Sequence, residues 1–163
     1  TDGAVACTID FSDEAGNAAT QVTAVTDATS VTYDRTIPSA TAVTIASNNA
    51  NTASATTGDI ITVSFTVNDD LLATPTATID GQAATVAVSG AHPNYTATYT
   101  TVGSTTEAAL GFTIDFSDEA GNAATQVTAV TDASSVTFDK TAPTATTVSI
   151  ASNNADTSAA AQG

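Results

Sequence analysis

Basic side chains are almost absent from this sequence. Its 163 residues include 2 Lys and Arg against 17 Asp and Glu, so the formal net charge is −15. A chain with so few cations has no positive surface for nucleic acid or for an anionic membrane. No apolar run approaches the roughly 18 residues that a membrane helix needs. We therefore expect a water-soluble protein with no nucleic-acid partner and no membrane insertion in this segment.

Side chains that serve catalysis are equally scarce. The chain has one Cys, one His and no Trp. A lone Cys excludes a disulfide framework and a Cys-based zinc site, and a lone His leaves little room for a Ser-His-Asp site. Carboxylate pairs of the kind that hydrolyse glycosides are present by number, but no local feature would raise a pKa or build a cleft. We predict that the chain is not an enzyme.

An internal repeat organises what the chain does contain, which includes 35 Thr and 34 Ala. Residues 8–51 recur at 113–156, an offset of 105, and 36 of the 44 aligned positions are identical. A period of this length matches one β-sandwich domain. We therefore predict that the chain is one stretch of a longer tandem array, cut at both ends. This also explains why no signal peptide opens the chain. The predicted parts are the end of one repeat, a complete repeat and the start of the next, over residues 1–34, 35–140 and 141–163.

Alternation of apolar and polar residues predicts short strands throughout the complete repeat. Ile61, Val63 and Phe65, for example, alternate with polar side chains. Asp80-Gly81 predicts a type I′ turn that joins the strands on either side as a hairpin, because both residues accept a positive φ. The predicted strands cover residues 41–47, 59–68, 75–80, 83–89, 94–101, 110–118 and 122–131. About seven strands with polar turns indicate an all-β fold, an immunoglobulin-like β-sandwich.

Four individual side chains carry expectations of their own. Tyr95 and Tyr99 alternate with Thr, which favours a place in the core over a sugar-stacking role. Cys7 occupies the position of Phe112 in the repeat, so we expect a buried thiol. Asn94 begins an Asn-Tyr-Thr sequon and is a candidate for glycosylation.

Acidic residues are predicted to gather where one repeat meets the next. In a sandwich with this strand order, the loops after the second and sixth strands lie at the end where the first strand enters. The candidate ligands for a Ca²⁺ ion at this end are Asp34, Asp69, Asp70, Asp118 and Glu119. Ca²⁺ takes six to eight oxygen ligands in flexible geometry. The spacing matches no EF-hand loop, so a solvated acidic surface that keeps the chain soluble is the alternative.

Several segments of the sequence resemble the bacterial Ig-like (Big) repeats of large secreted surface adhesins. The segments are GDIITVSF, YTATYT, FTIDFSDEAGN and VTFDKTAPT. The most specific parts are the D-x-A-G-N turn, at 13–17 and 118–122, and the D-[KR]-T-x-P linker, at 34–38 and 139–143. The resemblance implies a stalk-like array of domains outside the cell, at the cell surface, with Ca²⁺ often bound where repeats meet.

Three functional hypotheses follow from these observations. The first is a structural spacer in a surface adhesin, stiffened by Ca²⁺ at its junctions and by prolines in its linkers. The second is a subunit of an extracellular filament or surface layer, in which the partners include other copies as well as neighbouring repeats of the same chain. The third is a ligand-binding module, which would need an exposed apolar or aromatic patch that the sequence does not indicate.

Overall fold

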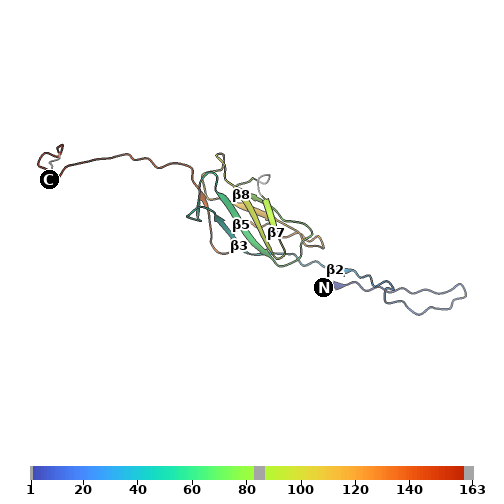
Figure 1. The fold of residues 1–163 in the computed structure, drawn as a ribbon. Coiled ribbons are helices and arrows are strands. Elements are labelled where there is room, and N and C mark those ends of the chain that lie inside the picture. Colours follow the sequence, from blue (N-terminus) through green and yellow to red (C-terminus); the bar gives the residue numbers. More distant parts are fainter. Residues whose placement is uncertain (1, 83–86, 160–163) are drawn as a thin grey trace.

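The computed structural model describes residues 2–82 and 87–159, and within them it contains strands and turns but no helix. Residues 39–139 form a β-sandwich-like domain, which confirms the all-β prediction. The segment 2–34 extends from one end of this domain, and residues 141–159 extend from the other (Figure 1). The proposed repeat boundaries at residues 34 and 140 coincide with these two exits and remain a prediction.

The larger sheet of the domain has four antiparallel strands. They are β3 (Ala40–Ser47), β5 (Ile60–Val67), β8 (Asn94–Thr100) and β7 (Ala87–Ala91), in the spatial order β3-β5-β8-β7. Every second residue of β5 is buried, as the alternation predicts. Phe65 of β5 lies opposite Tyr95 of β8, and their rings stack with centroids 5.7 Å apart. These cross-strand contacts fix the register of the two central strands.

A second, smaller layer faces this sheet. β6 (Thr76–Ile79) pairs antiparallel with β9 (Phe112–Asp115), and an isolated bridge joins Ile114 of β9 to Val127. The short strands β4 (Ser54–Ala55) and β10 (Thr137–Phe138) pair in parallel at one end of the domain. Outside the domain, β1 (Gly3–Ala4) pairs antiparallel with β2 (Thr32–Tyr33).

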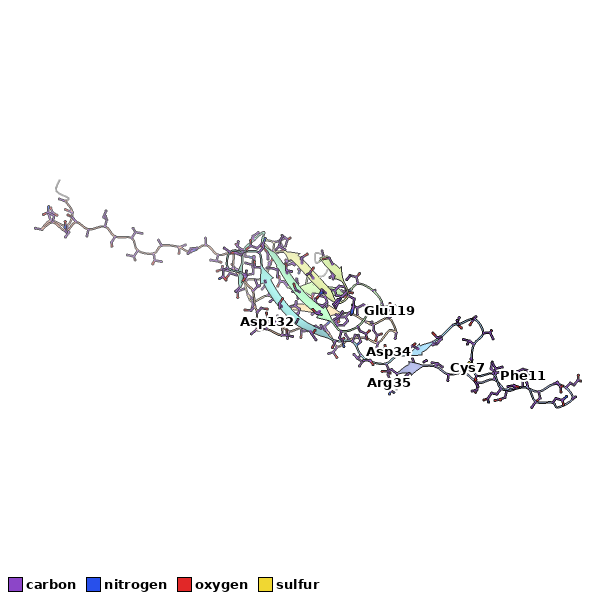
Figure 2. The ribbon with its side chains drawn as sticks, turned by 60° about the horizontal axis from the view of Figure 1, so that its bottom comes forward. Cys7, Phe11, Asp34, Arg35, Glu119 and Asp132 are labelled. Carbon is purple, nitrogen blue, oxygen red and sulfur yellow. The ribbon has the colours of Figure 1, made fainter. Side chains whose placement is uncertain are left out.

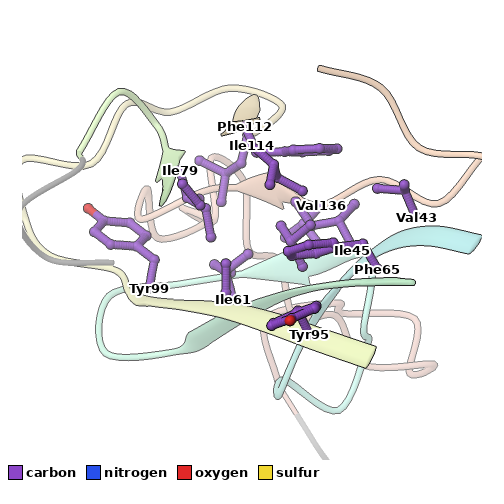
Figure 3. Close-up of a cluster of buried hydrophobic side chains, with 14 of the residues drawn as sticks. Val43, Ile45, Ile61, Phe65, Ile79, Tyr95, Tyr99, Phe112, Ile114 and Val136 are labelled. Carbon is purple, nitrogen blue, oxygen red and sulfur yellow. The ribbon is translucent and has the colours of Figure 1, made fainter. Parts of the chain in front are cut away.

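The hydrophobic core lies between the two layers (Figure 3). Its largest fully buried side chains include Tyr99, Phe65 and Phe138. The predicted core positions of Tyr95 and Tyr99 are confirmed, with 8% and 2% of their surface exposed. The hydroxyl of Tyr99 is 2.8 Å from that of Thr105, so its polar end is satisfied inside the core.

The turn at Asp80-Gly81 forms, and the described strands on either side of it pair with different partners. Both residues have positive φ, 53° and 70°, and the amide of Gln82 donates to the carbonyl of Ile79 at 3.0 Å. The strand before the turn, β6, pairs with β9, whereas the strand that follows, β7, pairs with β8. β6 and β7 therefore belong to different sheets, and the hairpin itself stays a prediction. Of the predicted strand 83–89, residues 83–86 lie outside the described residues.

The predicted last strand, 122–131, is not a regular strand. Within the described residues it makes isolated bridges only at Ala123 and Val127. By Thr131 the backbone has left β9, and its amide donates to the carbonyl of Val43 in the other sheet at 2.8 Å. Ala133 then takes a φ of 62°, which bends the chain before β10. The segment is therefore not a continuous strand, because it moves from one sheet to the other, although its apolar and polar residues alternate throughout.

The prediction of a buried thiol at Cys7 is wrong, since Cys7 is exposed. Its counterpart Phe112 is 8% exposed because it packs into the core beneath the four-stranded sheet. Within the described residues, segment 2–34 has no such sheet over it, and Cys7 and Phe11 lie along an extended arm (Figure 2). The repeat correctly aligns Cys7 with Phe112 in sequence, but it does not show whether a sheet covers the side chain.

Candidate metal site at the domain junction

Three carboxylates meet where segment 2–34 joins the domain. Asp34 comes from the linker, Asp69 from the loop between β5 and β6, and Asp118 from the loop after β9. One oxygen of each carboxylate lies within 4.8 Å of the others. The linker enters beside these loops because β3, which follows it, is antiparallel to β5. We call these three residues the junction triad.

The other two candidate ligands, Asp70 and Glu119, lie at the rim of the site. Both line the same cavity of about 320 Å³ as the triad. The Asp70 carboxylate faces His92, whose Nδ1 is 3.8 Å away, and the amide of Glu119 donates to the Asp70 carbonyl at 3.2 Å. Glu119 and Asp34 both lie on the side of the domain that faces the N-terminal arm (Figure 2). The structure therefore brings three of the five predicted residues into mutual reach and leaves two beside them.

Asp118 is the buried member of the triad, with 1% of its surface exposed. The backbone amide of Asn122 donates to its Oδ1 at 2.7 Å, and the Asn122 side chain donates to its Oδ2 at 2.8 Å. Burial raises the pKa of Asp118, but these hydrogen bonds outweigh it, and the pKa lies below the ordinary 3.8. The positive φ of Gly121, 92°, closes the turn that aims Asn122 back at this carboxylate. Asp118 is thus ionised and fixed in position at neutral pH.

Little positive charge balances the triad. Arg35 follows Asp34 in the chain, but its side chain turns to Asp2, with Nε 3.6 Å from the carboxylate. Asp34 and Asp69 accept backbone amides at 2.8 Å from Thr36 and Asp70, respectively. Within residues 2–82 and 87–159, no cation forms a salt bridge with the triad. An uncompensated group of carboxylate oxygens suits a hard cation such as Ca²⁺, which would neutralise their mutual repulsion.

Asn122 contacts the junction triad but was not among the candidate ligands of the sequence analysis. Its Nδ2 donates to Asp118 and also to the backbone carbonyl of Asp34, 3.3 Å away. The side chain therefore links the domain to the linker that enters it. The repeated D-x-A-G-N motif carried the available signal, because Asn17 makes the same two bonds to Asp13 at 2.8 Å. The additional bond to the linker depends on the neighbouring segment and has no signature in the motif.

The opposite end of the domain has acids but no such cluster among the described residues. There Glu107 accepts the amide of Lys140 and the hydroxyl of Thr141, both at 2.9 Å. The predicted glycosylation site, Asn94, is exposed at the start of β8, and its Oδ1 accepts the Thr66 hydroxyl at 3.1 Å. Its modification remains a prediction.

Comparisons with protein-family models, curated proteins and solved structures found no match to this chain. Among the described residues, no helix has the length and apolar character needed to cross a membrane. The resemblance to adhesin repeats and the assignment of Ca²⁺ therefore remain predictions, which the geometry of the junction makes testable.

Proposed function

We propose that this chain is a structural, non-catalytic part of a bacterial surface adhesin, in which immunoglobulin-like domains repeat in tandem and form an extracellular stalk. The strand order supports the domain type. The sheet β3-β5-β8-β7 faces a layer of β6, β9 and the segment around Val127, which corresponds to the ABED and CFG sheets of an immunoglobulin-like sandwich. The internal repeat supports the tandem arrangement.

The observation that carries the proposal is the way the linker is held. The amide of Ser39 donates to Asn68 Oδ1 at 2.7 Å, and the amide of Asn68 donates back to the Ser39 carbonyl at 3.2 Å. Pro38 fixes one backbone angle just before this pair. Together with the bond from Asn122 to Asp34, these contacts hold both ends of the linker against the domain. A short linker attached at both ends favours a spacer that resists bending.

Ca²⁺ at the junction triad would stiffen the stalk further. Asp34 belongs to the end of one repeat, whereas Asp69 and Asp118 belong to the next. An ion shared by the three would join two repeats through charge. The chain would supply the three carboxylates, and its rim residues Asp70 and Glu119 would add to the negative potential.

The test is thermal unfolding of this chain, which contains the whole junction triad, in EDTA and in millimolar Ca²⁺. An ion at a hundred times its dissociation constant adds about 2.7 kcal/mol to the free energy of unfolding. For a domain of this size that corresponds to a rise in Tm of roughly 10 °C or more. The rise should be lost in Asp69→Asn and kept in Asp13→Asn, since Asp13 occupies the Asp118 position of the incomplete segment. Coincident unfolding curves in EDTA and Ca²⁺ would mean that the triad does not bind Ca²⁺ and that the acidic residues serve to keep the chain soluble.

A filament or surface-layer subunit is the second candidate function. The observation that favours it is the edge strand β7, which is mostly exposed and, among the described residues, pairs with β8 alone. An exposed edge strand can pair with a strand of another copy. Sedimentation of the chain over a range of concentrations tests this function, because a stalk segment stays monomeric and a filament subunit does not.

A further inference from the structure

One carboxylate bonds to the linker at the point where the linker leaves the domain. Glu107, in the loop between β8 and β9, accepts the backbone amide of Lys140 and the hydroxyl of Thr141 on the same oxygen, Oε1, both at 2.9 Å. The amide of Asp139 donates to the carbonyl of Ala55 at 2.9 Å, and the amide of Thr141 donates to the Asp139 carboxylate at 2.8 Å. Three successive linker amides are therefore satisfied by the repeat that the linker leaves.

The earlier linker is bonded in the same way, although different residues make the bonds. Asp2, 105 positions before Glu107, accepts the amide of Arg35 at 3.3 Å and the hydroxyl of Thr36 at 2.6 Å. The amide of Thr36 again donates to the Asp two residues before it, Asp34, at 2.8 Å. The acid and the following cation are Asp and Arg in one copy and Glu and Lys in the other. The two linkers therefore share the bonding pattern, and not the particular side chains.

The bonds to the linker also lower the pKa of Glu107. Its pKa lies below the ordinary 4.5, chiefly because the Lys140 amide and the Thr141 hydroxyl bond to the ionised carboxylate. The positive charge of Lys140 lowers the pKa by a smaller amount. The Lys140 ammonium itself donates to the carbonyl of Gly103 at 2.8 Å. One loop thus bonds to both the backbone and the side chain of Lys140.

At the first junction, contacts from the two sides come within three residues of each other. Thr36 is bonded to Asp2 on one side, and Ser39 is bonded to Asn68 of the domain on the other. Only an Ile-Pro pair lies between Thr36 and Ser39. The proline ring fixes its own φ and restricts the isoleucine before it to extended conformations. Few backbone angles at this junction are therefore free to rotate.

We propose that the carboxylate at position 107, and at position 2 one period earlier, sets the direction in which the linker leaves its repeat. Each linker is then fixed by both of the repeats that it connects. The angle between repeats is determined by hydrogen bonds of the chain itself, before any cation binds at the junction triad. This inference rests on the tandem arrangement proposed above, but not on Ca²⁺.

The variant Glu107→Ala tests the proposal, because it removes an exposed side chain from the loop that bonds to the linker. The measurement is ¹⁵N relaxation of the Lys140 and Thr141 amides in EDTA. In the unmodified chain we expect order parameters near those of the strands, about 0.85, and in Glu107→Ala values below about 0.6. The control Glu119→Ala removes the same exposed side chain at the opposite end of the domain and should leave both values unchanged.

Two further variants separate the carboxylate from the rest of the loop. Glu107→Asp should keep both linker amides ordered, because Asp2 makes the same bonds in the earlier copy. Thr141→Val removes one of the two bonds and should raise the pKa of Glu107 toward 4.5, as measured by NMR titration of its carboxyl group. A pKa that does not change in this variant would contradict the bond from the Thr141 hydroxyl.

The proposal is wrong if Lys140 and Thr141 are mobile in the unmodified chain, or if they stay ordered in Glu107→Ala. Equal losses of order in Glu107→Asp and Glu107→Ala would also overturn it. These outcomes are independent of the proposed stalk function. A Ca²⁺-dependent rise in Tm together with unchanged order in Glu107→Ala would support the metal site and reject the role of Glu107. Coincident unfolding curves together with a loss of order in Glu107→Ala would do the reverse.

Discussion

Segments 2–34 and 107–139 have nearly the same sequence and make the same local bonds, yet only one is part of a core. Gln21 bonds to Asp10 as Gln126 bonds to Asp115, and Thr36 meets Asp2 as Thr141 meets Glu107. Turns, caps and short-range hydrogen bonds are therefore set by local sequence. Burial is not, because it depends on the 36–106 half that covers one segment within the described residues and leaves the other exposed.

Matched substitutions in the two segments can separate local from core contributions to stability. A substitution that acts through burial should matter only in segment 107–139. One that acts through a local hydrogen bond should have similar consequences in both. Each position in the first segment is thus a control for its counterpart 105 residues later.

The largest contrast is expected between Phe116→Ala and Phe11→Ala. Phe116 is 8% exposed within the core and Phe11 is 58% exposed. Removing a buried aromatic ring costs about 3–5 kcal/mol of unfolding free energy, whereas the same change at an exposed site stays within roughly 0.5 kcal/mol. Urea denaturation of the two variants measures the difference. Equal losses would mean that segment 2–34 is buried in solution, by self-association or otherwise.

A smaller contrast is expected between Asn122→Ala and Asn17→Ala. Both changes remove a donor from an Asp in the same turn, but only Asp118 is buried and needs the bond. Asn122→Ala should lower the melting temperature of the domain by several degrees and also free the linker, because Asn122 holds the Asp34 carbonyl. Asn17→Ala should leave the melting temperature unchanged. NMR relaxation of segment 2–34 reports the linker, and no gain in its motion in Asn122→Ala would contradict that role.

The alternation of apolar and polar residues correctly predicted the strands that stay within one sheet along their whole length. β5 and β8 were placed to within one or two residues, because one face of each is buried and the period of two is unbroken. The segment 122–131, expected as a strand, makes only isolated bridges, and at Thr131 it bonds to Val43 across the sandwich. A contact with the other layer of the sandwich does not change the local alternation of apolar and polar residues, so the sequence does not reveal it.

For the candidate site, the sequence likewise predicted which loops meet but not how each side chain is directed. Strand order alone indicated that the loops of Asp69 and Asp118 would meet the linker at Asp34, and the three side chains lie within mutual reach. The separation of Asp70 from this group depends on the direction of its side chain and on His92, 3.8 Å away. Neither is visible in sequence spacing. Whether the triad binds Ca²⁺ remains a prediction.

Acid should destabilise the domain, and Asp118 should account for part of the effect. Its folded-state pKa lies below 3.8, so its ionised form stabilises the fold above that pH, and this contribution is lost as the pH falls through the folded value. Asp118→Asn should therefore make stability less dependent on pH below about 4. Asp13 also has a lowered pKa, from its bonds with Asn17, but Asp13→Asn should leave the domain's acid unfolding unchanged. Denaturant midpoints between neutral pH and the acid range measure both.

The smallest effect is expected where the two segments should not differ at all. Gln126 Nε2 lies 3.0 Å from both oxygens of Asp115, and Gln21 Nε2 lies 2.8 and 3.1 Å from those of Asp10. All four side chains are on exposed surface, so Gln126→Ala and Gln21→Ala should each change the unfolding free energy by less than about 0.5 kcal/mol. A loss above 1 kcal/mol at Gln126 alone would mean that the core strengthens even this solvent-facing bond. In that case the strength of a local hydrogen bond would also depend on the core beneath it, and not on the local sequence alone.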